Sequence, residues 1–147
     1  MNGMNYRRIL LGGLLAGLVI NISEFVLNGI VLMDQAEAMM AAMGLQYTSW
    51  AMPAFVIMAF VWGLGLVTLY AAVRPRFGAG PWTALGVGLG FWLFVSVLPS
   101  VMFAAMGLGA GMIGISLVWT LVELPLAAEV GAWAYREAEA PARAPAL

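Results

Sequence analysis

The sequence predicts an all-α fold, a four-transmembrane-helix bundle with both chain ends in the cytoplasm and a short interfacial helix in the first outer loop. Three observations predict it. Hydrophobic residues make up 64% of the 147 residues and charged residues 9%, whereas a typical soluble domain carries about 25% charged residues. The apolar residues gather in four long runs, and all 6 basic residues lie outside those runs.

The four apolar runs cover about residues 9–32, 51–73, 82–106 and 111–135. Each holds about 20 residues or more, which suffices for a helix to cross a hydrocarbon core of about 30 Å. Helices are the expected form, because backbone groups in lipid must pair within their own segment and the runs do not alternate as barrel strands do. We expect one membrane domain over residues 1–136. The Ala-, Pro- and charge-rich residues 137–147 are expected to form a disordered cytoplasmic tail.

The basic residues predict the orientation of the chain. All are arginines, and they lie before the first run, between the second and third runs, and after the fourth: Arg7, Arg8, Arg74, Arg76, Arg136 and Arg143. In a chain that crosses a membrane four times, these three places share one side. The other two connections contain no Lys or Arg, so the positive-inside rule places both termini in the cytoplasm. We expect an integral protein of the bacterial cytoplasmic membrane.

The first run follows a basic start, as the apolar region of a secretory signal peptide does. Its length and its polar residues Asn21, Glu24 and Asn28 are unlike such a peptide. No clear small-residue cleavage site follows a short apolar region. We therefore expect an uncleaved signal anchor.

Aromatic residues stand where the runs are expected to meet the membrane surfaces. Two would mark the outer entry to the second run and four the inner interface: Tyr47 and Trp50, then Tyr70, Trp82, Trp133 and Tyr135. The outer segment from Met33 to Gln46 is rich in Ala and Met, and acidic residues near its start favour the helix dipole. This pattern predicts a short helix lying on the outer surface.

The residue types that are missing exclude much chemistry. The chain has no Cys, no His and no Lys. Thiol nucleophiles, zinc sites of Cys or His, the Ser-His-Asp triad, Schiff bases and phosphate loops of the Walker type are therefore excluded. We expect no cofactor, no bound metal and no enzymatic activity. An enzyme using two carboxylates on lipid head groups would need basic or metal-binding residues at the outer surface, and the sequence has none there.

Three glutamates fall inside the apolar runs, namely Glu24, Glu123 and Glu129. An ionisable side chain at membrane depth is costly, so it is expected to face the bundle interior. With a rise of about 1.5 Å per residue, Asn21 and Glu123 lie near the midplane and Glu24 about 6 Å toward the outside. Glu129 lies about 9 Å toward the cytoplasm by the same measure.

Helical spacing places small and polar residues on shared faces. On the first run this face is small in its inner half and polar in its outer half, with Gly13, Gly17, Asn21, Glu24 and Asn28. The fourth run offers Ser116, Thr120 and Glu123, and the third offers Ser96 and Ser100. We expect these faces to pack together, with a small-residue contact toward the inside and a polar cluster toward the outside.

Two prolines inside runs would add oxygen atoms to this cluster. Pro99 and Pro125 each free a carbonyl one turn earlier, near Val95 and Leu121. The candidate site for a proton, Na⁺ or a cationic substrate is then Asn21, Glu24, Asn28, Ser96, Ser100, Thr120 and Glu123. Two alternatives stay open. The same groups act as hydrogen-bonding glue between helices, at about 0.6–2 kcal/mol each, or they contact a larger complex.

Three tryptophans fall near mid-depth rather than at an interface, namely Trp62, Trp92 and Trp119. They would form an aromatic pocket for a cation or an apolar ligand, or else fill space in the bundle. Each indole N–H requires an acceptor in either arrangement.

The sequence favours a non-enzymatic accessory or structural subunit with an inward-facing polar cluster. The alternative is a proton- or cation-coupled small-molecule transporter. Four helices enclose little space, so the transporter would act as a homodimer. Expected partners are the lipid bilayer and a second copy or a larger membrane complex, with no nucleic acid.

The span pattern and the segment Gly90-Phe91-Trp92-Leu93-Phe94, followed by Pro99, resemble a group of uncharacterised bacterial four-helix membrane proteins of similar length. The first run departs from that pattern, since it carries Asn21, Ser23 and Glu24 where an aromatic pair is expected. The resemblance implies topology and no activity. A glutamate in the first span is also similar to the small multidrug transporters, but glutamates in the last span are foreign to them.

Overall fold

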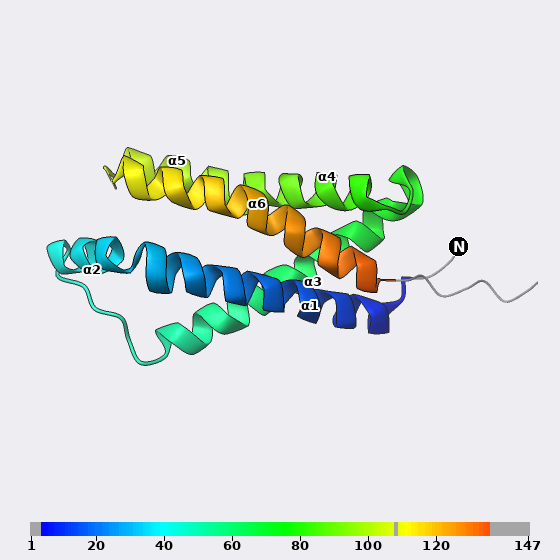
Figure 1. Cartoon of the computed structure of the whole chain (residues 1–147), viewed down its shortest axis with the longest axis horizontal. Coiled ribbons are helices and arrows are strands. Elements are labelled where there is room, and N and C mark those ends of the chain that lie inside the picture. The colour runs from blue at the N-terminus through cyan, green and yellow to red at the C-terminus, as the bar shows by residue number, and fades with distance from the viewer. Residues whose placement is uncertain (1–3, 108, 136–147) are drawn as a thin grey trace, which may run out of the picture.

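The computed structural model describes residues 4–107 and 109–135, and in this part the chain is helical with no strand (Figure 1). The α-helices and two π-helical turns follow one another as α1 (Tyr6–Val26), η1 (Leu27–Val31), α2 (Met33–Ala42), α3 (Ala51–Phe77), α4 (Pro81–Trp92), η2 (Leu93–Val97), α5 (Leu98–Ala105) and α6 (Ala110–Ala134). The predicted all-α class is confirmed.

Four continuous rods are long and apolar enough to cross a membrane. They are Tyr6–Val31, Ala51–Phe77, Pro81–Ala105 and Ala110–Ala134, with 26, 27, 25 and 25 residues. At about 1.5 Å per residue each rod is about 37–40 Å long. The four predicted runs are thus confirmed as helices. The second rod extends about one turn beyond its predicted end, and the chain reverses over glycines with positive φ at Gly78 and Gly80.

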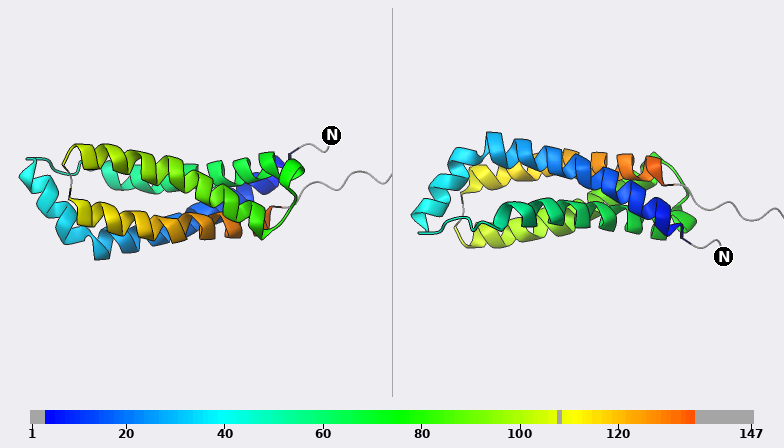
Figure 2. Two further views of the ribbon diagram at one scale, coloured as in Figure 1. Left: turned by 90° about the horizontal axis from the view of Figure 1, so that it is seen from above. Right: turned by 90° about the horizontal axis from the view of Figure 1, so that it is seen from below.

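The rods run along the length of an elongated bundle (Figures 1 and 2). α1 packs along both α3 and α6, and α4 packs along α6. The start of α1, the α3–α4 turn and the end of α6 lie at one end of the bundle, which we call the arginine end because Arg7, Arg8, Arg74 and Arg76 are there. The opposite end carries α2 and is called the α2 end. Arg136, Arg143 and the predicted tail lie outside the described residues.

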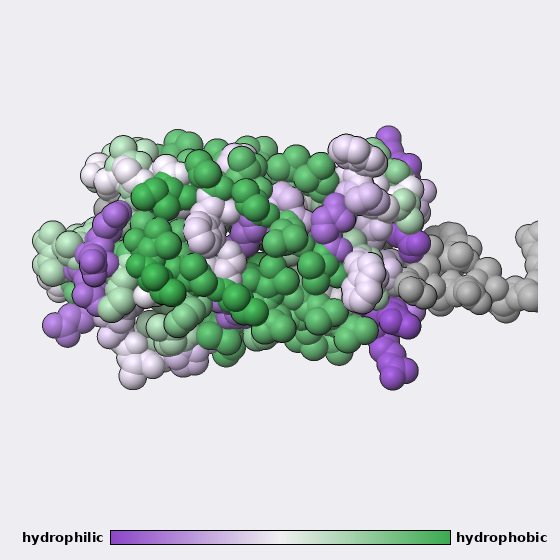
Figure 3. Space-filling view, in the orientation of Figure 1, coloured by the Kyte–Doolittle hydropathy of each residue, from purple (hydrophilic) through white to green (hydrophobic). Residues whose placement is uncertain are grey.

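The outer surface of the bundle is largely apolar. Figure 3 shows green hydrophobic side chains across the middle of one face and purple hydrophilic ones mainly toward the two ends. Large apolar side chains on all four rods are exposed, among them Leu14, Phe55, Phe94 and Val122. In water such a surface would drive aggregation, whereas in a bilayer it faces acyl chains.

Glycines bring the helices into backbone contact in the half near the arginine end. A Cβ built on Gly63 of α3 would collide with the backbones of Gly13 and Gly17 on α1. A Cβ on Gly12 would lie 2.6 Å from the carbonyl oxygen of Gly131 on α6. We call these five residues the glycine seam, and such small residues let helix backbones approach closely.

The seam corrects one detail of the predicted packing. Gly13 and Gly17 were expected to meet the last span, but they meet α3 instead. α1 lies between α3 and α6, and Gly12 is turned about 100° from Gly13 around the helix axis. One row of α1 therefore faces α3, and the neighbouring row faces α6.

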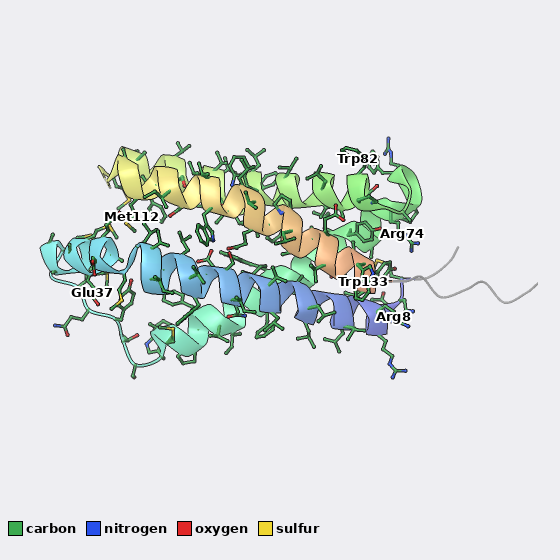
Figure 4. The ribbon with its side chains drawn as sticks, viewed as in Figure 1. Arg8, Glu37, Arg74, Trp82, Met112 and Trp133 are labelled. Atoms are coloured by element: carbon green, nitrogen blue, oxygen red, sulfur yellow. The ribbon has the colours of Figure 1, made fainter. Side chains whose placement is uncertain are left out.

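The aromatic residues at the arginine end fall into two groups. Trp82 and Trp133 are 83% and 79% exposed, as expected for interfacial residues (Figure 4). Tyr70 and Tyr135 were expected there too, but each is 4% exposed and their rings pack edge to face with centroids 6.1 Å apart. The Tyr70 hydroxyl accepts the backbone N–H of Gly80 at 3.1 Å. This partner explains how a polar ring is buried at a helix end.

Candidate functional site

A polar cavity of about 160 Å³ lies in the half of the bundle near the α2 end. Its walls come from α1 with η1, from α3, from η2 with α5, and from α6. The residues with polar or aromatic side chains that line it most directly are Glu24, Asn28, Trp62, Ser96, Ser100, Ser116 and Thr120. Apolar walls are contributed by Leu27, Val95, Pro99, Phe103 and Leu117.

Two π-helical turns shape the cavity. In η1 the N–H of Leu32 donates to the carbonyl of Leu27 at 2.8 Å, and in η2 the N–H of Leu98 donates to the carbonyl of Leu93. Each bond spans five residues instead of four, so one extra residue is inserted into each wall. η2 ends two residues before Pro99, whose missing N–H prevents an ordinary helical bond at this point. The sequence predicted a freed carbonyl there, and the structure places a π-turn.

Glu24 and Asn28 form the acidic side of the cavity. The side-chain amide of Asn28 donates to the Glu24 carboxyl and, at 3.3 Å, to the Glu24 backbone carbonyl. Glu24 is half-buried and is held by a residue one turn later on the same rod. Ser96 and Ser100 line the same cavity, and their hydroxyls make no hydrogen bond to other residues in the described part of the chain.

Thr120 lines the cavity from α6, and its hydroxyl donates to the Ser116 carbonyl at 2.8 Å. The cavity therefore brings together five of the seven residues in the predicted site, with Ser116 beside them. They come from α1, η1, η2, α5 and α6.

Asn21 is not part of the cavity lining. Its side-chain amide donates to the Gly17 carbonyl at 2.9 Å and to the Val56 carbonyl of α3 at 3.3 Å. Asn21 continues the row of Gly13 and Gly17, and that row faces α3. The structure thus gives Asn21 the hydrogen-bonding role between helices that the sequence left open as an alternative.

The three mid-depth tryptophans likewise divide between the cavity lining and hydrogen bonds that join helices. Trp62 of α3 lines the cavity. The Trp92 indole donates to the Leu117 carbonyl of α6 at 3.1 Å, and the Trp119 indole donates to the Ser23 hydroxyl of α1 at 2.8 Å. Trp92 and Trp119 therefore tie neighbouring helices together, and only Trp62 of the predicted aromatic pocket lines the cavity among the described residues.

Glu123 lies one turn beyond Thr120 on α6, toward the arginine end. It is 4% exposed, and neither carboxyl oxygen has a hydrogen-bond partner among the described residues. Its polar neighbours are the Ser23 hydroxyl, which does not reach hydrogen-bond geometry, and the Glu24 carboxyl, which interacts with it electrostatically. Glu129 lies farther toward the arginine end and is half-buried.

Sequence reasoning missed Ser23 as a neighbour of the site. Ser23 follows Gly12, Ala16 and Ile20 at intervals of four, four and three, which is the row of α1 that faces α6. The other residues of that row are apolar, so its one hydroxyl could have predicted a polar contact with α6. Phe103 was missed too, although it follows Ser100 by one helical turn.

Comparisons of the chain with protein-family models, with curated proteins and with solved structures give no match. Within residues 4–107 and 109–135, no three His, Cys, Asp or Glu side chains gather as a metal site would require.

Proposed function

We propose that the chain crosses a membrane four times, with the arginine end in the cytoplasm and the α2 end outside. The length of the four rods, the apolar outer surface and the arginines at one end support this placement. In this orientation the polar cavity lies in the outer half of the bundle. α2 then lies at the outer membrane surface.

The cavity is proposed to bind a small cation. Glu24 is its ionisable residue, and the arginines of the described chain lie at the other end of the bundle. The hydroxyls of Ser96 and Ser100 offer oxygen atoms, and the Trp62 ring offers an aromatic surface for a cation. At about 30 Å³ per water molecule, the cavity has room for about five waters or for a small organic ammonium ion.

The same geometry supports a carrier. The cavity lies in the outer half, while the glycine seam packs α1, α3 and α6 tightly in the inner half. A solute that enters from outside meets a closed path, which is the arrangement of one state in alternating access. We therefore propose a proton- or cation-coupled small-molecule transporter. Since four helices enclose little space, it is proposed to act as a homodimer.

The observation that carries this proposal is a carboxylate on a polar cavity in one half of the bundle, while glycine contacts pack the other half tightly. Binding of tetramethylammonium, ethylammonium and Na⁺ to the purified protein in lipid nanodiscs tests it, with calorimetry as the measurement. We expect one of these cations to bind, and Glu24→Gln to weaken that binding at least about tenfold, as loss of a charge-assisted contact does.

Glu129→Gln is the matched control, because it makes the same chemical change outside the cavity. Its affinity is expected to equal that of the unaltered protein. If none of the three cations binds, or if both variants bind equally well, the proposal is wrong.

The competing function is an accessory or structural subunit. The ties made by Asn21, Trp92 and Trp119 between helices favour it, because they use polar groups to hold the bundle together. Under that function Glu24→Gln leaves cation binding unchanged and changes only stability or the recovery of a partner complex.

A further inference from the structure

Glu123 is a buried acid that the cation-binding cavity does not use. Both of its carboxyl oxygens are enclosed by protein, and none has a hydrogen-bond partner in the described part of the chain. Its side chain is not in contact with lipid, since 4% of the residue is exposed. An ionised carboxylate left there without hydrogen bonds would carry a large desolvation cost, so its charge must be compensated or removed.

The surroundings of Glu123 favour a proton over a metal cation. A dehydrated Na⁺ is held by several oxygen ligands at once, such as unwound backbone carbonyls together with side-chain oxygens. The polar neighbours of Glu123 are the Ser23 hydroxyl and the Glu24 carboxyl, and the Ser23 oxygen already accepts the Trp119 indole. A proton requires one carboxyl oxygen only.

Glu123 also lies next to the cavity. Thr120, one helical turn before it on α6, lines the cavity, and so does Glu24, which follows Ser23 on α1. The charge of the Glu24 carboxyl therefore acts electrostatically on the Glu123 carboxyl. α4, η2 and α5 contain no titratable residue, and the titratable or charged residues of α3 lie near its arginine end, at Tyr70, Arg74 and Arg76. Beyond Glu24, the nearest acid along α6 is Glu129.

We propose that Glu123 carries an exchangeable proton, which it gives to and takes from water in the polar cavity, and that a cation bound at Glu24 promotes its release. One carboxyl oxygen holds the proton in one state, and the carboxylate forms when that proton passes to a cavity water. A negative Glu24 opposes a second negative charge nearby, whereas a cation bound there removes that opposition. This inference rests on the proposed function in so far as cations enter the cavity, and Glu123 would be the site that couples them to protons.

Labelling with dicyclohexylcarbodiimide tests the proposal without a known substrate. This apolar reagent adds to a protonated carboxyl: the acid proton passes to a carbodiimide nitrogen, the carboxyl oxygen bonds to the central carbon, and rearrangement leaves a stable N-acylurea. The protein in lipid nanodiscs is labelled from acidic to alkaline pH, and peptide mass spectrometry locates the adduct.

We expect an adduct on Glu123 at acidic pH that declines as the pH rises. It is absent in Glu123→Gln, whose fold is checked by circular dichroism and size-exclusion chromatography. In Glu24→Gln the decline occurs at a lower pH, because one neighbouring negative charge is gone. A purely structural Glu123 that keeps its proton throughout would show neither the decline nor the shift. In Glu24→Gln, which lacks the carboxylate that binds the cation, replacing N-methylglucamine by Na⁺ at constant ionic strength leaves the labelling unchanged.

Three results would overturn the proposal. One is labelling of Glu129 without labelling of Glu123 at any pH. Another is protection of Glu123 by Na⁺ in Glu24→Gln, which would make Glu123 itself a sodium site. The third is a pH profile that Glu24→Gln does not move. The two proposals fail separately. Labelling that depends on pH without cation binding refutes the proposed function, and with it the effect of a cation on Glu123, but leaves the exchangeable proton. Cation binding without labelling refutes only the proton site.

Discussion

The two halves of this bundle differ in how closely their helices pack, although the same four rods pass through both. Near the arginine end the helices touch through glycine backbones, and polar side chains such as Tyr70 are buried with partners. Near the α2 end the rods carry π-turns and enclose a polar cavity with an acidic wall. Close packing leaves no room for a ligand, so the half near the arginine end is the frame and the half near the α2 end holds the candidate site.

A small chain can have both stability and a cavity when close packing and the cavity lie in different halves of the bundle. In lipid the hydrophobic effect does not drive helices together, so van der Waals packing and interhelical hydrogen bonds must do so. The glycine seam concentrates that packing over a few turns. The half near the α2 end can then lose contacts around Glu24, because the bonds from Trp92 and Trp119 hold its walls.

The largest effect on stability is expected from adding one methyl group in the glycine seam. In Gly63→Ala the new Cβ collides with backbone atoms of Gly13 and Gly17, which cannot rotate away, so α1 and α3 must separate. Overpacking of this kind costs about 1–3 kcal/mol or more, and we expect the upper part of that range. Unfolding in mixed micelles with increasing sodium dodecyl sulfate, followed by circular dichroism, measures the loss.

Gly65→Ala is the matched control for the seam. Gly65 lies two residues away on the same helix, and a Cβ there would meet only the Phe91 ring at an ordinary distance of 3.6 Å. Its free energy of unfolding is expected to stay within about 0.5 kcal/mol of the unaltered protein, as for surface substitutions in general. Equal losses in both variants would show that the backbone contact does not set the stability of the half near the arginine end.

A smaller effect is expected from changes in the walls of the half near the α2 end. Trp119→Phe keeps the ring but removes the donor to Ser23, and bonds of this kind between membrane helices contribute about 0.6–2 kcal/mol. Trp133→Phe, at a tryptophan that is 79% exposed, is the control and is expected to leave the free energy of unfolding unchanged. Both are measured by the same denaturation.

A double-mutant cycle measures the coupling between Trp119 and Ser23 directly. If the bond holds the wall, Ser23→Ala adds little to Trp119→Phe, because the interaction is already lost. Simple addition of the two losses would mean that the indole stabilises α6 by packing alone.

Much of the fold was predictable because lipid restricts the choices. Runs of about 20 apolar residues can only be helices there, and the four rods are found where the runs are. The end of α3 was predicted too early, since Arg74 and Pro75 suggested a loop but the helix continues to Phe77. Long arginine side chains reach the membrane surface from within a helix, so a charge does not mark the helix end.

The candidate site was predictable in its residue types and less so in its geometry. Glu24, Asn28, Ser96, Ser100 and Thr120 were selected as polar groups at membrane depth, and the cavity gathers them. Asn21 shares their spacing on an ideal helix, but it faces α3. Spacing alone does not say which neighbour a face meets, and the π-turns that shift the register leave almost no trace in the sequence. Only Pro99 marked one of them.

The smallest effect on stability is expected from removing the π-turn η2. Its removal would make the half near the α2 end more regular, like the half near the arginine end. In Pro99→Ala the restored N–H can donate to the Val95 carbonyl, so η2 can return to a regular helix and the extra residue in this wall is lost. Neighbouring groups already satisfy the freed backbone in lipid, so the free energy of unfolding changes by less than about 1 kcal/mol. Cation affinity, in contrast, is expected to fall about two- to threefold, because Val95 and Ser96 would move relative to Glu24. Calorimetry beside the denaturation measurement separates the two quantities. An unchanged affinity would mean that the cavity owes its shape to the spread of the helices and not to the π-turn.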